Sequence, residues 1–307
     1  MSQTHDVIIV GAGPAGLSSA IYAGRAMLDT LVLEKGAPGG QILMTDFIEN
    51  YPGFPEGVVP VELTENFRKQ AERFGAKIEI ETIKELQKEE PLWKLIGNKN
   101  EYLARAVIIA TGANFKRLGI KGEGKFTGRG VSYCATCDGF FFRDKVVAVV
   151  GGGSWALTEA LFLTKFARQV KVIHRRDQFR AEKILQERTL SHTKIEVVWD
   201  TVIEGISGDS TLKSLNVKNV KTGKQTEFEV DGLFVSIGTI PNSEFVKELV
   251  ERNEWQEIVV GKNFETSQTG IYAAGDVTDA CPQQVATAVG SGVVAAIAAD
   301  EYLQSLE

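Results

Sequence analysis

The sequence predicts an α/β protein of two doubly wound, three-layer domains, with the second domain inserted into the first. Three observations predict this class. A unit of apolar strand, glycine-rich loop, helix and second strand starts at residue 7, and the same unit starts again at residue 146. Near its end the chain returns to a short apolar strand at residues 271–274, which is followed by Gly275-Asp276 and a long helix. Repeated units of this kind favour parallel sheets covered by helices on both faces.

Length and composition agree with this class. The chain has 307 residues, which is long for a single hydrophobic core and supports two domains. Its net charge of −6 argues against a general nucleic-acid-binding protein, because such proteins carry a basic face. Residues 1–6 are polar, and the apolar stretch 286–299 is too short for a membrane span. We therefore expect a soluble, cytoplasmic protein with no nucleic-acid or membrane partner.

The first repeat and its surroundings give the elements of the first domain. An apolar strand is expected at residues 7–10, followed by the glycine loop 11–16, a helix over 14–27 and a strand at 31–33 that ends at Glu34. The remaining elements are expected to be a loop at 41–60, a helix at 61–74, strand-like runs at 77–83 and 93–96 that form a small antiparallel insertion, and a strand at 106–110 that ends in Thr111-Gly112.

The second repeat has the same order of elements. A strand is expected at 146–150, a glycine loop at 151–156, then a helix, and a strand at 170–173 that ends in His174-Arg175-Arg176. Further strands are expected at 195–199, 212–217, 228–230 and 232–237, and the C-terminal core helix begins near Gln284. The crossovers between the two domains are expected near 113–118 and 239–242.

Both glycine loops have the pattern of a dinucleotide site. A single Gly-x-Gly-x-x-Gly is a weak signal, but here each cluster follows an apolar strand and opens a helix. The glycines allow a tight turn and a close approach of the backbone to a pyrophosphate, and the helix N-terminus supplies amide donors and a partial positive charge. The sequence therefore predicts two Rossmann-like nucleotide-binding domains.

The residue that ends the second strand differs between the two sites. Glu34 can accept hydrogen bonds from the ribose hydroxyls of an adenosine and would repel a 2′-phosphate, which fits FAD or NAD. Arg175, Arg176 and Arg180 would pair with a 2′-phosphate, which fits NADP. The alternative interpretation of these arginines is a solvated helix start. One nucleotide is thus expected to be NADP, and the other should be the group that takes its hydride, a flavin.

A second observation supports the flavin. Asp276 ends a buried strand, where a carboxylate is costly without a hydroxyl or amide partner, and the ribityl chain of a flavin supplies hydroxyls. The helix that begins near Gln284 would aim its N-terminus at the flavin. The alternative for Asp276 is a helix N-cap or turn residue.

Cys134 and Cys137 stand in Cys-x-x-Cys spacing just before the second repeat. In a cytoplasmic protein such a pair is catalytic or metal-binding rather than structural. Zinc would need two more ligands, and neither Cys281 nor the three histidines have metal-binding spacing, so no metal is expected. Asp138 is a candidate acid that shuttles a proton to or from a thiolate, or else a turn residue. No role is assigned to Cys281.

Three stretches carry a resemblance to a known family: residues 134–140 (CATCDGF), 174–181 (HRRDQFRA) and 273–277 (AAGDV). With them, nearly the whole chain closely resembles the low-molecular-weight, bacterial-type thioredoxin reductases. The resemblance implies a homodimeric flavoprotein disulfide oxidoreductase. Residues 1–115 and 242–307 would form the FAD-binding domain, and residues 116–241 the NADPH-binding domain with the redox-active disulfide.

The resemblance also implies the reaction and its residues. Hydride passes from NADPH to FAD, then to the Cys134–Cys137 disulfide, and dithiol–disulfide exchange reduces thioredoxin. Cys137 is implied as the flavin-proximal thiol and Cys134 as the interchange thiol, and the NADPH domain is implied to rotate about the two crossovers. A looser carry-over places Arg129 and residues 140–142 near the thioredoxin contact.

The nucleotide-binding residues follow from the same resemblance and from the loops. The FAD residues are Gly11, Gly13, Pro14, Ala15, Gly16, Glu34, Lys35, Gly39, Gly40, Gln41, Asn50, Thr111, Gly112, Asp276, Gln283, Gln284 and Val285. The NADPH residues are Gly151, Gly153, Ser154, Trp155, Ala156, His174, Arg175, Arg176 and Arg180.

Two departures from the family pattern keep other functions open. Trp155 is bulky at the point where the dinucleotide approaches, and Gln283 stands where the family often has arginine. The indole is expected to pack on the FAD domain, to stack on the nicotinamide end, or to block the site in part. The alternatives are an FAD-dependent small-molecule dithiol oxidase, a ferredoxin–NADP reductase, which would not need the cysteine pair, and a non-catalytic redox sensor.

Overall fold

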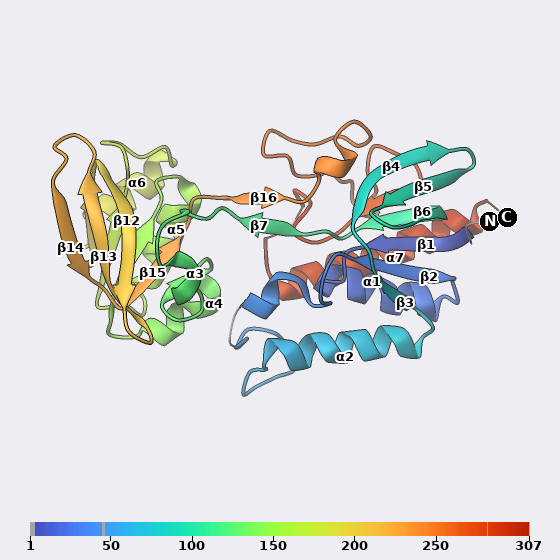
Figure 1. Cartoon of the computed structure of the whole chain (residues 1–307), viewed down its shortest axis with the longest axis horizontal. Helices are drawn as coiled ribbons and strands as arrows, with labels where there is room; N and C mark the ends of the chain where they lie inside the picture. The colour runs from blue at the N-terminus through green and yellow to red at the C-terminus, as the bar shows by residue number, and fades with distance from the viewer. Residues whose placement is uncertain (1–3, 45–46, 281, 307) are drawn as a thin grey trace. The chain divides into compact units, whose positions relative to one another are not determined.

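The computed structural model describes residues 4–44, 47–280 and 282–306, so Cys281 lies outside the described residues. The chain forms two compact units. Unit 1 comprises Met1–Asn114 and Ile240–Glu307, and unit 2 comprises Phe115–Thr239. The second unit is thus inserted in the sequence of the first, as Figure 1 shows by the colour order of the ribbon.

Unit 1 contains a seven-stranded sheet in the order β3-β2-β1-β6-β5-β4, with β17 also paired to β6. Its strands are β1 (Thr4–Val10), β2 (Thr30–Glu34), β3 (Lys77–Ile80), β4 (Ile83–Glu89), β5 (Leu92–Gly97), β6 (Glu101–Ile109) and β17 (Ile271–Ala273). The strands β1, β2, β3, β6 and β17 run parallel, and β4, β5 and the start of β6 form an antiparallel meander. The carboxyl ends of β1, β2, β6 and β17 therefore meet at one edge of the sheet.

The helices of unit 1 are α1 (Pro14–Arg25), α2 (Pro60–Arg73) and α7 (Val285–Gln304), with 3₁₀ turns at η1 (Gly40–Met44) and η3 (Glu244–Val246). The helices α1 and α7 cover one face of the sheet together (Figure 1). Small residues let their backbones approach closely, since the Ser19 hydroxyl donates to the Gly292 carbonyl at 2.9 Å. A Cβ on Gly292 would lie 2.2 Å from the Ala15 carbonyl oxygen. This contact fixes the start of α1 against the last helix.

Unit 2 contains a parallel five-stranded sheet in the order β11-β10-β9-β15-β8 and an antiparallel sheet β12-β13-β14. The strands are β8 (Val131–Ser132), β9 (Val146–Val150), β10 (Gln169–Ile173), β11 (Ile195–Val198), β12 (Thr201–Gly208), β13 (Leu212–Asn219), β14 (Gln225–Glu229) and β15 (Gly232–Val235). One cluster of buried side chains joins the parallel sheet to α5 (Ser154–Leu163), and another joins its opposite face to β12 and β13. These three layers are what the repeated unit predicts.

Two chain segments connect the units, and they pair with each other as a two-stranded ladder. They are β7 (Ala113–Phe115) and β16 (Thr239–Pro241), drawn side by side in Figure 1. The ladder is anchored on unit 1 by Thr111, whose hydroxyl donates to the Asn242 carbonyl at 2.8 Å. The Asn242 amide returns a hydrogen bond of 2.8 Å to the Thr111 carbonyl.

Most expected elements are present, and the predicted fold class is confirmed. The run 77–83 was expected in the antiparallel insertion, but it divides: β3 pairs in parallel with β2, and only β4 begins the meander. The division falls at Glu81, whose carboxylate accepts four backbone N–H groups around residues 82 and 98–100. The strand β12 and the helix α6 (Lys183–Ser191) were not expected from the sequence.

Candidate functional site

The two cysteines of the Cys-x-x-Cys motif form a disulfide, with their Cα atoms 5.3 Å apart. Cys134 is the second residue after β8 and caps the short helix α4 (Ala135–Asp138), because its sulfur accepts the Cys137 backbone N–H at 3.2 Å. Ala135 between them is fully buried, whereas Thr136 is exposed. The buried alanine anchors the turn, and both sulfur-bearing residues lie at the partly exposed surface of unit 2.

Asp138 belongs to the same turn and is held by Ser132. The Ser132 hydroxyl donates to Asp138 Oδ2 at 2.6 Å, and its oxygen accepts the Cys134 backbone N–H at 3.1 Å. One hydroxyl thus joins the acid expected from the sequence to the backbone of the first cysteine. This arrangement keeps a carboxyl group beside the disulfide, where proton transfer to a thiolate is possible.

A second carboxyl beside the turn, Glu159 on α5, was missed in the sequence. Its Oε1 accepts the Ala135 backbone N–H at 2.8 Å, and its Oε2 accepts the Ser236 hydroxyl. Burial raises the pKa of Glu159, and hydrogen bonds from the Ala135 backbone and from Ser236 oppose this rise. A sequence pattern could have revealed Glu159. It is the single acid on a helix face whose other residues, at 156, 157, 160 and 163, are apolar and fully buried.

The first glycine loop, between β1 and α1, has no room for side chains. Gly11 has φ of +107°, and a Cβ on Gly16 would lie 1.8 Å from the Gly11 carbonyl oxygen. A Cβ on Gly40 would lie 3.1 Å from the Gly13 Cα, so the segment after β2 returns to the loop. The N-terminus of α1 has no side-chain cap, which leaves its first N–H groups for a ligand.

Glu34, at the end of β2, is tied to that loop. Its Oε2 accepts the Ala12 N–H at 2.7 Å, and its Oε1 accepts the Gly36 N–H at 3.0 Å. The Gly39 N–H donates to the Ala12 carbonyl at 2.8 Å. Lys35 is exposed beside this group, and Gln41 is partly exposed in η1. The carboxylate expected to meet a ribose therefore lies at the rim of the glycine loop.

Asp276 follows β17 at the same edge of the sheet, after Gly275 with φ of +76°. Burial raises the pKa of Asp276 to about 6. Within the described part of the chain, its carboxylate has no hydrogen-bond partner, and no cation pairs with it. Asp276 is partly buried, and a desolvated carboxyl without a partner is costly, so this site suits a ligand that brings hydroxyl groups.

The other expected FAD residues of unit 1 gather around the start of α7. The Asn50 side-chain amide donates to Gln284 Oε1 at 3.0 Å, which joins the 41–60 loop to the N-cap of this helix. No side chain caps the helix, and Val285 is its first residue. Gln283 precedes them in partly exposed chain. Gly112, with φ of +64°, accepts the Asn242 N–H at 2.9 Å through its carbonyl.

The second glycine loop, between β9 and α5, rests on His174. A Cβ on Gly152 would lie 2.2 Å from the His174 ring, and this histidine is only 5% exposed. Phe179 and Trp199 contact the same ring. Burial, followed by the charges of the neighbouring arginines, lowers the pKa of His174. His174, expected among the nucleotide contacts, thus lies beneath the loop.

The arginine cluster has the opposite environment. Arg175, Arg176 and Arg180 are exposed, and across residues 4–44, 47–280 and 282–306 none of them forms an ion pair with an acid. The Arg180 N–H donates to the Gly152 carbonyl at 2.8 Å, so the segment is attached to the glycine loop. Three unpaired guanidinium groups beside such a loop form an anion site.

The helix after this loop begins at Ser154 and Trp155, next to the buried Gly151 and Ala156. A Cβ on Gly153 would meet no atom within 4 Å, so the space in front of the helix is open. Trp155 is partly buried, and its side chain lowers the pKa of Glu159, one turn further along α5. The indole therefore interacts with a residue of its own helix.

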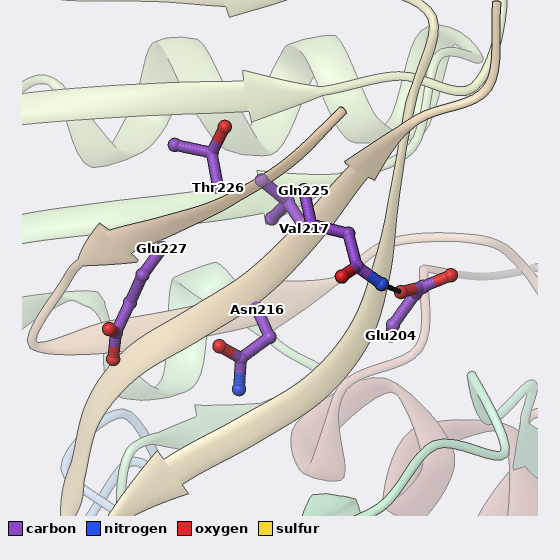
Figure 2. A pocket seen from close by; sticks show the side chains of 6 residues that line it. All are labelled: Glu204, Asn216, Val217, Gln225, Thr226 and Glu227. Atoms are coloured by element: carbon purple, nitrogen blue, oxygen red, sulfur yellow. Dashed lines mark hydrogen bonds between the residues drawn. The ribbon is translucent and has the colours of Figure 1, made fainter. Parts of the chain in front are cut away.

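A surface hollow of unit 2 lies away from these residues. It covers the strands β12, β13 and β14 and is lined by Glu204, Asn216, Val217, Gln225, Thr226 and Glu227 (Figure 2). Its acids already have partners, since Gln225 donates to Glu204 Oε2 at 2.8 Å and the Ser214 hydroxyl donates to Glu227 Oε1 at 2.5 Å. None of the residues expected from the sequence contributes to it.

The described residues were compared with the arrangements that a metal site and a membrane-spanning helix require. Among them, no group of three or more His, Cys, Asp or Glu side chains has the arrangement of a metal site. No helix in this part of the chain has the length and apolar character needed to cross a membrane.

Two doubly wound units, each with a glycine loop, and a reducible disulfide beside one of the loops define a nucleotide-dependent disulfide oxidoreductase.

Comparisons with known proteins agree with this class. Residues 5–292 match the model of the family described as Pyridine nucleotide-disulphide oxidoreductase. A relative from Mycolicibacterium smegmatis, named thioredoxin reductase, is 47% identical over 98% of both chains. Another with this name, from Treponema pallidum, is 45% identical over the full length of both.

A solved structure supports the same assignment. The thioredoxin reductase of Streptococcus pyogenes MGAS5005 is 40% identical, covers 99% of this chain and 100% of its own, and superposes with a TM-score of 0.95. The chain belongs to the pyridine nucleotide-disulphide oxidoreductases and, within them, to the thioredoxin reductases. The protein is accordingly an NADPH-dependent flavoenzyme with FAD as its cofactor. The dithiol oxidase, ferredoxin–NADP reductase and sensor alternatives are not favoured.

The described residues fit both nucleotides. For FAD, the backbone cradle at Gly11–Gly16 admits no side chain, and Asp276 is a buried carboxyl that still needs a donor. For NADPH, the open N-terminus of α5 lies beside the unpaired Arg175, Arg176 and Arg180. A phosphate-bearing ligand supplies the charge that these three arginines lack.

Proposed function

We propose that this protein reduces the disulfide of thioredoxin through its Cys134–Cys137 pair. The observation that carries the proposal is the disulfide itself, which lies in a partly exposed turn of the unit that also holds the arginine-flanked glycine loop. The similarity to proteins named thioredoxin reductase supports thioredoxin as the substrate. Bound FAD supplies a two-electron carrier between the nicotinamide nucleotide and the disulfide.

The cysteines complete the reaction by exchange. The disulfide takes up two electrons and two protons, which breaks its S–S bond and leaves two thiols. Cys134 then loses its proton and attacks one sulfur of the thioredoxin disulfide, and the other thioredoxin sulfur leaves and is protonated. Cys137 loses its proton and attacks Cys134 Sγ, which re-forms the Cys134–Cys137 bond and releases the second thioredoxin sulfur, again protonated. We assign Cys134 as the interchange thiol, as the resemblance to the thioredoxin reductases implies.

Asp138 is proposed as the acid that handles these protons. The Ser132 hydroxyl, at 2.6 Å from Asp138 Oδ2, holds the carboxyl within the turn, and the same hydroxyl binds the Cys134 backbone. A carboxyl group so placed can return a proton to a departing thiolate without a change in the backbone.

The two units divide the nucleotides between them. We propose that unit 1 binds FAD at the glycine loop, Glu34, Asp276 and the start of α7, and that unit 2 binds NADPH. Residues 151–156 would face the pyrophosphate, and the three arginines would face the 2′-phosphate. His174 would support the loop from below, because its ring fills the space under Gly152.

A homodimer and a cytoplasmic location complete the proposal. The family resemblance implies two subunits, and sedimentation of the holoenzyme tests this. The cytoplasmic location is proposed because NADPH is an intracellular reductant.

The cysteine variants test the proposed function. Cys134→Ser and Cys137→Ser should each keep reduction of the flavin absorbance by NADPH and lose NADPH oxidation in the presence of thioredoxin. Cys281→Ser is the matched control and should retain turnover. Normal thioredoxin reduction in either of the first two variants would refute the relay.

A further inference from the structure

Glu159 is the one carboxyl on the buried face of α5, and its oxygens contact three separate parts of unit 2. It is 6% exposed and surrounded by the fully buried Ala156, Leu157, Ala160 and Leu163. A carboxyl in such a place is costly unless its oxygens are fully used. The sequence analysis gave it no role.

The first contact reaches the disulfide turn. Glu159 Oε1 accepts the N–H of Ala135 at 2.8 Å. This N–H belongs to the peptide that joins Cys134 to Ala135, so the carboxylate lies within one peptide of the first cysteine. Among the described residues, the one backbone N–H that donates to Cys134 Sγ is that of Cys137, at 3.2 Å. The Glu159 carboxylate therefore uses the Ala135 N–H, a backbone donor of the cysteine turn, as its own hydrogen-bond partner.

The other two contacts reach the nucleotide loop. Glu159 Oε2 accepts the hydroxyl of Ser236, and Ser236 follows β15 directly. The carbonyl of Ser236 lies under the loop, since a Cβ on Gly151 would be 2.4 Å from it. The side chain of Trp155, on the first turn of α5, also favours the charged form of this carboxyl by lowering its pKa. One carboxyl thus connects the second glycine loop to the cysteine turn.

These contacts determine how the group acts on the cysteines. A negative charge beside a dithiol disfavours the thiolate, whereas a strongly oxidising pair is one whose reduced form is stabilised. The donors from Ala135, Ser236 and Trp155 favour the charged form of Glu159, while burial and the charge of Asp138 raise its pKa. Asp138 is the other titratable group that acts on this carboxyl.

We propose that Glu159 is a positioning residue for the Cys134–Cys137 pair. It holds the peptide after Cys134 and keeps a negative charge there, which makes the reduced pair a stronger reductant. The Ser236 hydroxyl holds the carboxylate in place, and the Trp155 side chain favours its charged form. This inference rests on the proposed redox role of the two cysteines.

The test is the pH dependence of Cys134 alkylation. The dithiothreitol-reduced holoenzyme is treated with iodoacetamide between pH 6 and 9, and peptide mass spectrometry separates Cys134 from Cys137 and Cys281. In Glu159→Gln, an amide oxygen still accepts the Ala135 N–H, but the charge is gone. Its alkylation midpoint should fall by about one pH unit relative to the native protein. Trp155→Phe and Ser236→Ala should lower the midpoint less, because each removes only one donor to the carboxylate.

The matched control is Glu123→Gln. Glu123 is as buried, at 3%, and accepts the N–H groups of Leu118 and Gly119 and the hydroxyl of Tyr133, but not the peptide after Cys134. Its midpoint should remain native. Retained flavin absorbance and cooperative unfolding verify that each variant is folded.

The outcomes separate the two proposals. A native midpoint in Glu159→Gln, with or without a shift in Glu159→Ala, would overturn the role of the charge. Thioredoxin reduction that survives alkylation of Cys134 in the native protein would overturn the proposed function instead. A shifted midpoint in Glu159→Gln, together with loss of native turnover on alkylation, supports both.

Discussion

The two glycine loops are built from the same elements but differ in what lies under them and at their rims. The first loop is closed by backbone: Gly16 meets the Gly11 carbonyl, and the rim carries Glu34, whose carboxylate accepts the N–H of Ala12 in the loop and of Gly36 after β2. The second loop also meets backbone, at the Ser236 carbonyl under Gly151, but the ring of His174 lies under Gly152, and its rim carries exposed arginines. A rim carboxylate and rim arginines select nucleotides of opposite character, without and with a 2′-phosphate.

The groups that lie under the two loops indicate which loop tolerates substitution of its glycines. A side chain such as the His174 ring can turn away from an added atom, whereas the backbone of the first loop cannot move without displacing β1 and α1. We therefore expect substitutions in the first loop to have the larger effects.

The largest effect is expected for Gly16→Ala. Its Cβ would lie 1.8 Å from the Gly11 carbonyl oxygen, so the variant should lose FAD and about 3 kcal/mol or more of stability. Gly152→Ala, whose Cβ meets the His174 ring, should lose less. The A450/A280 ratio and urea unfolding measure both. Gly13→Ala, with its nearest atom at 3.9 Å, is the control for stability, and equal losses in all three would remove the distinction.

Asp276 provides the next effect, which depends on pH. Its pKa of about 6 lies above the ordinary value of 3.8. Between about pH 4 and pH 6, Asp276 therefore keeps its proton in the folded, FAD-free protein, whereas the unfolded chain has released it. Its contribution to stability is thus present below about pH 4 and is lost as pH rises through 6. Asp276→Asn should be the more stable FAD-free protein at pH 7, by about 3 kcal/mol at most, and close to native at pH 4.

Urea unfolding of both FAD-free proteins at the two pH values measures this difference. Asp279→Asn, an exposed neighbour, is the control. The holoenzyme should show the reverse order, because bound FAD supplies the hydroxyl partner. A stability difference that does not change with pH would contradict the buried, unpartnered carboxyl.

The arginine rim should determine the choice of nucleotide. Replacing both Arg175 and Arg176 by Ala should raise the KM for NADPH at least about tenfold, since each charge-assisted hydrogen bond to a phosphate contributes about 1.5–3 kcal/mol. The KM for NADH should stay near native. Steady-state kinetics with both nucleotides measure this, and equal increases would mean that these arginines are structural.

The smallest effect is expected for His174→Phe. An aromatic ring of similar size keeps the support under Gly152. His174 Nε2 has no hydrogen-bond partner, so the interaction that is lost is the one between the ring and the Gln178 backbone. The ratio of the two KM values should remain within about threefold of native, which corresponds to less than 1 kcal/mol. A large loss of NADPH preference would show that the imidazole itself contacts the phosphate.

The sequence was sufficient for elements whose chemistry fixes both residue type and spacing. The glycines, Glu34, the arginines and the Cys134–Cys137 pair each satisfy a local requirement of turn geometry, charge or redox chemistry, so a single stretch of chain reveals them. The strand β12 and the helix α6 were missed because their apolar patterns are weak: α6 leaves Ile184 and Leu190 half exposed.

The contacts between residues far apart in the chain could not be predicted from the sequence. His174 follows a strand end like Glu34, but only the fold shows that its ring turns under Gly152. Glu159 is 24 positions from Ala135 and 77 from Ser236, and the three meet because α5, α4 and the end of β15 share one face of unit 2.

An anaerobic NADPH titration tests most directly whether the loops and the disulfide form one electron path. The native holoenzyme should consume twice as much NADPH per flavin as the Cys134→Ser variant before the flavin is fully reduced, because the disulfide stores a second pair of electrons. Equal consumption by the two proteins would contradict the account, since the Cys134–Cys137 bond would then lie outside the path from nucleotide to thioredoxin.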